Sequence, residues 1–135
     1  MGFVHTEITL KNVNDMFRAK EGLIPASKIR QTTVSALVDT GAWTLAINEA
    51  TRAELGLEIV GNHIGKLANG VIEEYNLAGP VEVRWKDRRV VCEPLVVPTA
   101  GDILLGAIPM EAMDLIISPR MELVGAHGDI IIHRV

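Results

Sequence analysis

The chain has 135 residues, 48% of them hydrophobic, which suits one domain with one substantial core. No apolar run approaches the roughly 18 residues of a membrane span, and a net charge of -4 argues against broad attraction to nucleic acid or anionic lipid. The only cysteine, Cys92, cannot form an internal disulfide, and the N-terminus carries neither a basic stretch nor an apolar secretory core. We therefore expect a single cytoplasmic domain over residues 1–135 that binds neither nucleic acid nor membranes.

The first half of the chain is predicted to form short strands and one helix. Alternating and β-branched residues predict strands over 5–13 and 29–38, with an irregular stretch over 14–27 between them. The second of these strands ends directly before Asp39. Asn48 is a suitable N-cap and Gly56 a natural stop, which together predict a short helix over 49–55.

Two hairpins are predicted in the middle of the chain. The tip of the first is Ala68-Asn69-Gly70, because the Asn-Gly pair accepts the positive φ angles of a tight turn. The second joins strands over 81–85 and 89–97 through the Lys86-Asp87 turn, and Pro94 marks an edge or a bulge in it.

The last third of the chain continues the pattern of short strands. Residues 103–105 form an apolar strand that Gly106 ends, and Pro109 suits the first turn of a helix that continues to Met113. Further strands are predicted over 115–117, 121–124 and 129–135, the last two as a terminal hairpin. The sequence thus predicts an all-β domain with two short helices.

The most informative segment is Asp39-Thr40-Gly41-Ala42, which follows the apolar pair Leu37 and Val38. Peptide hydrolysis by a carboxylate and a water needs an acidic side chain on a tight, glycine-containing turn. Of the six aspartates, only Asp39 is followed by Thr or Ser and then Gly, so a site of paired carboxylates must take its second one from another chain. The alternative is an ordinary surface aspartate in an Asx turn, where Asp and Gly are common.

Three features, in this order, resemble the retropepsin-like, single-domain aspartic proteases, including small prokaryotic members of that clan. They are the Asp39 turn behind two apolar residues, the hairpin tip at 68–70, and Leu104-Leu105-Gly106 ahead of a short helix. The resemblance implies a closed β-barrel or sandwich with a flap hairpin, assembled as a homodimer. It also implies an aspartic endopeptidase that cleaves peptide or protein substrates without a metal or another cofactor.

The resemblance assigns roles to individual residues. Asp39 of each subunit would share one proton with its counterpart and activate a water between them. Thr40 would hydrogen-bond to the opposite subunit's turn, and Gly41 would let backbone amides approach the carboxylate. Ala42 would keep the turn small beside the substrate, and the Ala68-Asn69-Gly70 tip would close over the substrate as a flap and exclude water.

The chain departs from the viral pattern on both sides of the site. Viral members carry an Arg directly after the Gly that corresponds to Gly106, paired with an acidic residue shortly after the catalytic turn. Here Ala107 follows that Gly and Trp43-Thr44-Leu45 follows the turn, so the ion pair is absent and we expect a different brace. Trp43 is either a core residue or a wall of the substrate pocket.

Other sites and functions have weaker support in the sequence. His127, Asp129 and His133 would share one face of a strand and could hold a metal ion, although histidines near a terminal turn are more often exposed. The basic cluster around Trp85 resembles a nucleic-acid patch, but charges at a hairpin tip are usually solvated; its members are Arg84, Lys86, Arg88 and Arg89. Cys92 is expected to be a buried small apolar residue. A function of another class is a catalytically inactive module of this fold for dimerisation or peptide binding, against which the retained Asp39 motif argues.

Overall fold

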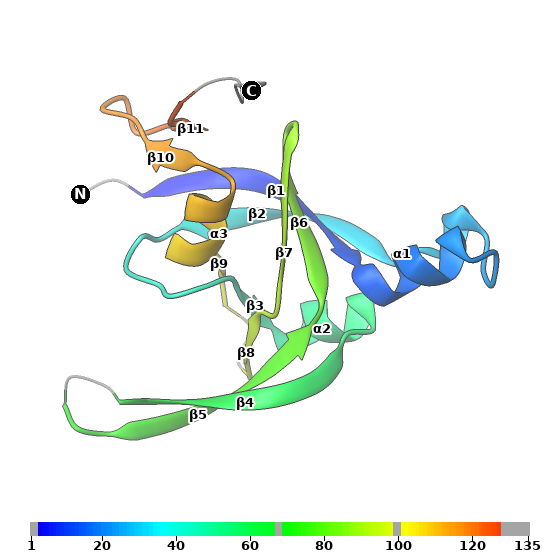
Figure 1. The fold of residues 1–135 in the computed structure, drawn as a ribbon. Helices are drawn as coiled ribbons and strands as arrows, with labels where there is room; N and C mark the ends of the chain where they lie inside the picture. Colours follow the sequence, from blue (N-terminus) through cyan, green and yellow to red (C-terminus); the bar gives the residue numbers. More distant parts are fainter. Residues whose placement is uncertain (1–2, 67–68, 99–100, 128–135) are drawn as a thin grey trace, which may run out of the picture.

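The computed structural model describes residues 3–66, 69–98 and 101–127 (Figure 1). Within them the strands are β1 Val4–Asn12, β2 Gln31–Val38, β3 Ala46–Asn48, β4 Glu58–Lys66, β5 Ile72–Gly79, β6 Val81–Trp85, β7 Arg88–Cys92, β8 Leu95–Val97, β9 Ile103–Leu105, β10 Leu115–Ile117 and β11 Leu123–Gly125. The helices are α1 Val13–Lys20, α2 Glu49–Leu55 and α3 Ala107–Ala112, with a short 3-10 helix η1 Ala26–Lys28. No helix of the described residues has the length and apolar character to cross a membrane.

Nine of the described strands form one sheet in the order β4-β5-β8-β3-β9-β2-β1-β6-β7, and β10 and β11 form a second, two-stranded sheet. β2 lies inside the large sheet, antiparallel to β1 and parallel to β9. Its last residue, Val38, is level with Leu105 at the end of β9, so both strands end at the same edge. The expected all-β class with short helices is confirmed, although in the described residues the sheet keeps two separate edges, β4 and β7, and does not close into a barrel.

A continuous apolar core holds the sheet together. Its most deeply buried side chains include Ile8, Leu10, Leu45, Ile47, Leu55, Leu57, Val81, Val83 and Leu105. Leu45 closes the loop that follows β2, and Leu105 ends the strand beside it. The loop is therefore anchored in the core at Leu45 and lies beside the buried end of β9, which limits how far the loop can move.

The helix predicted over 49–55 is confirmed together with its caps. The Asn48 side chain accepts a hydrogen bond from the Thr51 N–H at 2.8 Å. Gly56 ends the helix in the left-handed conformation, with φ of 62°. The cap signals are local, which explains why the sequence located this element so closely.

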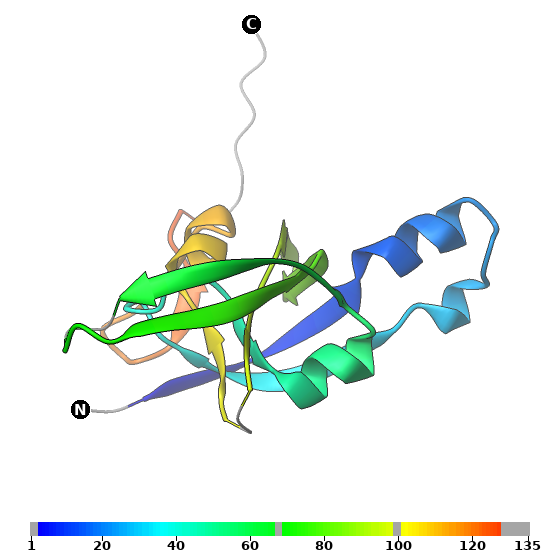
Figure 2. The same cartoon turned by 90° about the horizontal axis from the view of Figure 1, so that it is seen from below.

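The irregular stretch predicted over 14–27 is wrong in its first part, which forms α1. Asn12 caps this helix by accepting a hydrogen bond from the Asp15 N–H at 3.0 Å. Asp15 is 3% exposed and accepts hydrogen bonds from the backbone N–H of Arg30 at 3.0 Å and from its Nε at 2.8 Å. Figure 2 shows α1 and η1 projecting beyond the sheet, so these bonds fix the projection to the start of β2. The extra helix makes three α-helices in the described residues, where two were expected.

The later strands differ from the prediction in their partners. The run predicted over 89–97 breaks at Pro94, as that proline indicated: β7 pairs with β6, whereas β8 pairs with β5 and β3. The strand predicted over 121–124 is β11, and its partner among the described residues is β10. The expected partner over 129–135 lies outside the described residues.

The hairpin predicted around Asn69-Gly70 is confirmed as β4–β5. Its ladder runs from Glu58 and Gly79 at the base to Lys66 and Ile72 near the tip. At the tip, the Asn69 side chain accepts a hydrogen bond from the Val71 N–H at 3.0 Å, and Gly70 has φ of 86°; Ala68 lies outside the described residues. β8 pairs with β5 only at Asn76 and Leu77, so the outer part of the hairpin is a two-stranded ribbon beyond the main sheet.

Candidate active site

Asp39 is the first residue after β2, on a turn that its own side chain stabilises. Its N–H donates to the Leu105 carbonyl at 3.0 Å, which continues the pairing with β9 past the end of the strand. One carboxylate oxygen accepts a hydrogen bond from the Gly41 N–H at 2.9 Å, and the Ala42 N–H donates to the Asp39 carbonyl at 3.1 Å. This is the local geometry of an Asx turn, but here the turn is fixed to a buried strand and the carboxylate stays partly exposed.

Gly106 lies directly beneath this loop. The N–H groups that open α3 are satisfied by loop carbonyls, Ala107 donating to Ala42 at 2.9 Å and Ile108 to Trp43 at 3.1 Å. A Cβ at Gly106 would stand 2.3 Å from the carbonyl oxygen of Thr44 and 2.7 Å from that of Ala42. The backbone of the loop therefore approaches Gly106 closely, and α3 is the brace in this chain.

Thr40 and Gly41 form the exposed rim of the turn. A Cβ at Gly41 would stand 3.2 Å from the nearer carboxylate oxygen of Asp39, which favours glycine here. Among the described residues the Thr40 hydroxyl has no hydrogen-bond partner. It is therefore available to a group outside this subunit.

Trp43 is neither a core residue nor a free surface side chain. It is 49% exposed, and its indole ring stacks on the imidazole of His63, with 4.6 Å between ring centroids and 25° between ring planes. His63 lies on β4, so the stack joins the active-site loop to the hairpin. Sequence reasoning did not select His63; the available signal was its position between Gly61 and Gly65 on one face of a strand.

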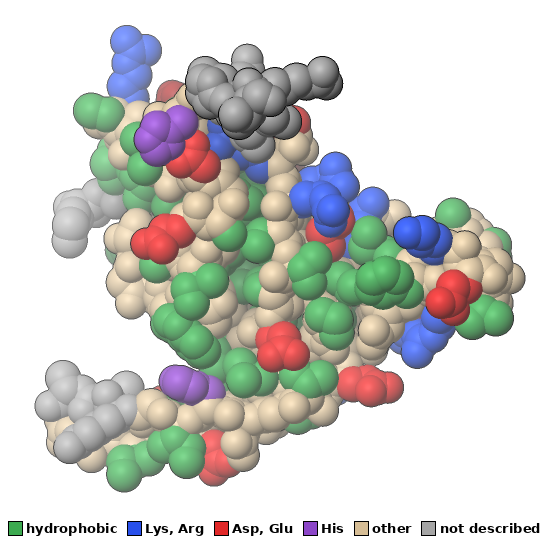
Figure 3. All heavy atoms as spheres, in the orientation of Figure 1, with side chains coloured by type: hydrophobic (Ala, Val, Ile, Leu, Met, Phe, Trp, Pro, Cys, Tyr) green, Lys and Arg blue, Asp and Glu red, His purple; other side chains and the backbone are tan. Residues whose placement is uncertain are grey.

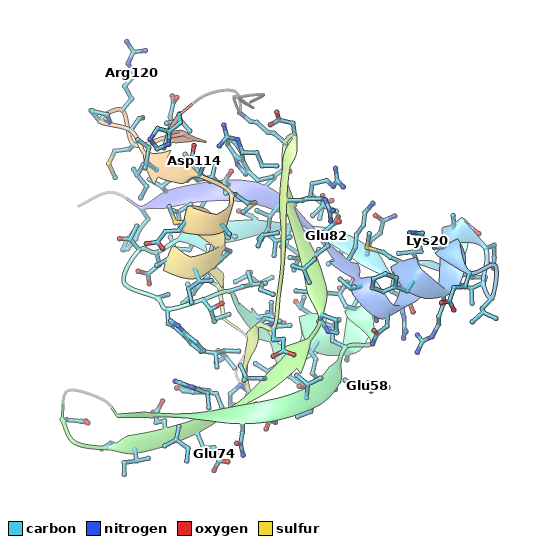
Figure 4. The ribbon with its side chains drawn as sticks, in the orientation of Figure 1. Lys20, Glu58, Glu74, Glu82, Asp114 and Arg120 are labelled. Atoms are coloured by element: carbon cyan, nitrogen blue, oxygen red, sulfur yellow. The ribbon has the colours of Figure 1, made fainter. Side chains whose placement is uncertain are left out.

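The loop over residues 39–45 faces the outer half of the hairpin across a space between the two ribbons (Figure 1), and the Trp43–His63 stack links them. Figure 3 shows an open notch between the outer hairpin and the body of the molecule. Glu74, on the hairpin, points away from the body (Figure 4). Its partner across the ladder is Ile64, so His63 and its partner Tyr75 lie on the opposite face, toward the loop.

The face of the hairpin turned toward the loop also carries a hydrogen-bonded acid and phenol. The Tyr75 hydroxyl donates to the Glu73 carboxylate. This bond raises the pKa of Tyr75, because it stabilises the protonated phenol and would be lost on ionisation. Both side chains are partly exposed.

Only His127 of the alternative metal site lies within the described residues. Among the described residues, no group of three or more His, Cys, Asp or Glu side chains could hold a metal ion. His127 instead contacts Asp114, with 2.6 Å between its Nδ1 and a carboxylate oxygen. Asp129 and His133 lie outside the described residues.

The arginines of the basic cluster at the β6–β7 hairpin, which were expected to be solvated, make several intramolecular contacts. Glu82 is 1% exposed and pairs with Arg84 at 3.3 Å and with Arg89 at 3.0 Å (Figure 4). Arg88 donates to the carbonyl oxygen of Met113 at 2.7 Å. These contacts use the arginines to hold the hairpin in place, which leaves less charge for a polyanion.

Comparison with protein families identifies the chain. A family model described as aspartyl protease matches residues 26–108. The chain belongs to the aspartyl protease family. The match includes the Asp39 turn, the β4–β5 hairpin and Gly106, the features on which the resemblance was based. No curated protein matches the chain at a significant level.

Solved structures show its fold. EIAV protease, solved in complex with the inhibitor HBY-793, is 21% identical with a TM-score of 0.50, over 82% of this chain and 86% of that one. The retroviral protease-like domain of Ddi1 from Leishmania major is 16% identical with a TM-score of 0.54, over 89% and 84%. A retropepsin-like aspartic protease from Rickettsia conorii is 14% identical with a TM-score of 0.41, over 82% of each chain. The first two show that the chain has the retropepsin-like fold.

Proposed function

We propose that the protein is an aspartic endopeptidase that works as a homodimer, in which each subunit supplies one Asp39. The observation that carries the proposal is the Asp39 carboxylate, held by the Gly41 N–H at 2.9 Å at the end of a buried strand, in a chain of the aspartyl protease family. The proposed substrates are peptides or proteins, met in the cytoplasm.

The need for a second subunit follows from the other aspartates. Asp15 is bound by Arg30, and Asp114 contacts His127. Asp87 is exposed at the β6–β7 turn. Asp102 precedes β9 and is level with Ser35, so it lies about 13 Å along the sheet from Asp39 at roughly 3.3 Å a residue. Since no described aspartate of the same subunit faces Asp39, a second copy is the simplest source of the partner carboxylate.

In the proposed reaction, the two Asp39 carboxyl groups hold one proton and a water between them, since two close carboxylates cannot both ionise cheaply. The ionised group takes a proton from the water as the water oxygen bonds to the scissile carbonyl carbon. The protonated group gives its proton to the carbonyl oxygen, which leaves a neutral tetrahedral intermediate with two hydroxyl groups. The C–N bond then breaks as the first group protonates the nitrogen and a hydroxyl returns its proton to the second, giving a carboxylic acid and an amine.

The neighbouring elements supply the remaining requirements. Thr40 is exposed and unpartnered within the described residues, which suits a hydrogen bond to the second subunit. The β4–β5 hairpin is joined to the main sheet only near its base, which suits a flap that opens for substrate and closes to exclude water.

Mixing two forms of the chain tests both the carboxylate and the dimer. Asp39→Asn should abolish cleavage of an unfolded polypeptide, whereas the exposed Asp102→Asn should cleave like the wild type. When wild type and Asp39→Asn are refolded together in equal amounts, random pairing leaves about a quarter of the dimers with two Asp39 residues. The activity of the mixture should therefore be about a quarter of that of an equal total amount of pure wild-type protein.

Several outcomes would contradict the proposal. Equal fragment patterns from wild type and Asp39→Asn would exclude Asp39 as the catalytic acid, and no cleavage by either form would support an inactive module of this fold. Activity at half in the mixed sample would mean that each subunit works alone. The shared proton also requires the rate to fall at alkaline pH, so a rate still rising at pH 10 would exclude this mechanism.

A further inference from the structure

We propose that the stack between Trp43 and His63 fixes the hairpin over Asp39, so that both are positioning residues for the cleavage proposed above. The inference rests on that proposed function for its catalytic part only. Its structural part rests on how Trp43 and His63, the two ends of the stack, are attached to the rest of the molecule.

The Trp43 end is rigid. Its carbonyl accepts a hydrogen bond from the Ile108 N–H at 3.1 Å, and the neighbouring Ala42 carbonyl accepts one from Ala107 at 2.9 Å. Two residues later Leu45 is fully buried. The indole therefore stands on the same braced loop as Asp39, four residues further along the chain.

The His63 end is on the outer, two-stranded part of the hairpin. β8 holds β5 at Asn76 and Leu77, and the next residue toward the tip is Tyr75, the ladder partner of His63. The stack thus adds a side-chain attachment one residue pair beyond the last backbone attachment to the main sheet. A ribbon held at these two points can rotate less about its base than a ribbon held at one.

The surroundings of His63 indicate that the contact is specific and not the result of crowding. Gly61 and Gly65 flank it on the same face of β4. A Cβ at Gly65 would meet no atom within 4 Å, so larger residues would fit there within this subunit. β4 therefore places the His63 imidazole against the loop and leaves the backbone at Gly61 and Gly65 uncovered. A substrate backbone that approaches the flap closely would require such an uncovered backbone.

Fluorescence quenching tests the contact without any assay of cleavage. Trp43 is 49% exposed and Trp85 only 6%, so acrylamide quenching reports mainly on Trp43. His63→Ala should uncover one face of the indole and raise the quenching constant, and His63→Phe should restore it. Ile64→Ala is the matched control, because Ile64 is the next residue of β4 and its side chain lies on the opposite face.

Kinetics and amide exchange test the positioning role. Loss of one aromatic pair changes an equilibrium roughly 2- to 10-fold, so His63→Ala should raise KM by that factor with kcat little changed, because hairpin closure belongs to binding. Amides of the hairpin tip should exchange faster by a similar factor. Trp43→Ala and the double variant should change KM and amide exchange no more than His63→Ala alone does, since all three variants remove the same contact.

The outcomes separate the two proposals. Equal quenching in wild type and His63→Ala would show that the stack is absent in solution and would overturn the inference. Increased quenching with unchanged KM and unchanged exchange would overturn the positioning role. If the wild type cleaves no polypeptide, the proposed function fails, and quenching with amide exchange still decides whether the stack holds the hairpin.

Discussion

Replacing Gly106 with alanine is the sharpest test of how the active-site loop is held. Gly106 has φ of -93°, a conformation open to any residue, so backbone strain is not the obstacle. The obstacle is space: the added methyl carbon would stand 2.3 Å from the Thr44 carbonyl oxygen and 2.7 Å from that of Ala42. Both contacts are with backbone atoms, so no side-chain rotation can relieve them.

The size of the effect follows from these distances. Relieving a 2.3 Å contact requires the loop or the start of α3 to move by about 1 Å. Overpacking of this kind costs about 1–3 kcal/mol, and loss of the Ala107 to Ala42 hydrogen bond adds about 1 kcal/mol. We therefore expect Gly106→Ala to lower the free energy of unfolding by about 2–4 kcal/mol, or Tm by roughly 6–12 °C in a domain of this size. Since the same loop carries Asp39, a 1 Å displacement should reduce cleavage about 100-fold.

Urea unfolding at one fixed protein concentration measures the stability change, because the proposed dimerisation would make apparent stability depend on concentration. Gly101→Ala is the matched control: a Cβ there meets no atom within 4 Å, and its φ is not in the left-handed region. It should leave stability unchanged or raise it by up to about 1 kcal/mol. A Gly106→Ala variant with the unfolding midpoint and activity of the wild type would refute this account of the loop.

Two further predictions concern Asp15, which is buried, and Cys92, which is only partly buried and not fully buried as expected; both lie away from the site. Arg30 lowers the pKa of Asp15 from 3.8 to about 2, so Asp15→Asn should reduce the free energy of unfolding by about 2 kcal/mol at pH 7. Because the folded-state pKa is the lower one, this stabilisation is present above about pH 4 and lost as the pH falls toward 2. Urea unfolding should therefore show a smaller difference in the free energy of unfolding between wild type and Asp15→Asn at pH 2.5 than at pH 7. An equal difference at both pH values would contradict this prediction. Burial raises the pKa of the Cys92 thiol to about 12, so a thiol reagent at pH 8 should modify the native protein at least roughly tenfold more slowly than the urea-unfolded protein, and equal rates would exclude that burial.

Prediction from sequence succeeded where an element carries its own signals. Asn48 and Gly56 fixed both ends of α2, and Asn69-Gly70 located the tip of the hairpin. α1 was missed because its stability depends on a buried carboxylate, Asp15, whose partner Arg30 comes 15 residues later. An acidic residue near the start of a helix is usually expected to be exposed, and only the position of a cationic partner such as Arg30 shows that it is buried.

The candidate site shows the same division. The turn at Asp39 was recognisable because residue type and order alone restrict a short backbone segment. A brace other than the viral ion pair was expected, but its form, Gly106 against the carbonyls of Ala42 and Thr44, became known only from the tertiary structure, in which β2 pairs in parallel with β9. His63 was missed because nothing local connects it to Trp43, twenty residues earlier.

The amino-acid sequence by itself determined the aspartate turn, the glycines that the loop and the hairpin tip require, and the succession of short strands. Each of these depends on backbone freedom and side-chain chemistry within a few residues. Only the tertiary structure decided the order of strands in the sheet, the position of α3 beneath the loop, and the stack of Trp43 on His63. These depend on how a twisted sheet brings distant segments together, and packing energy between such segments leaves no local pattern in the chain.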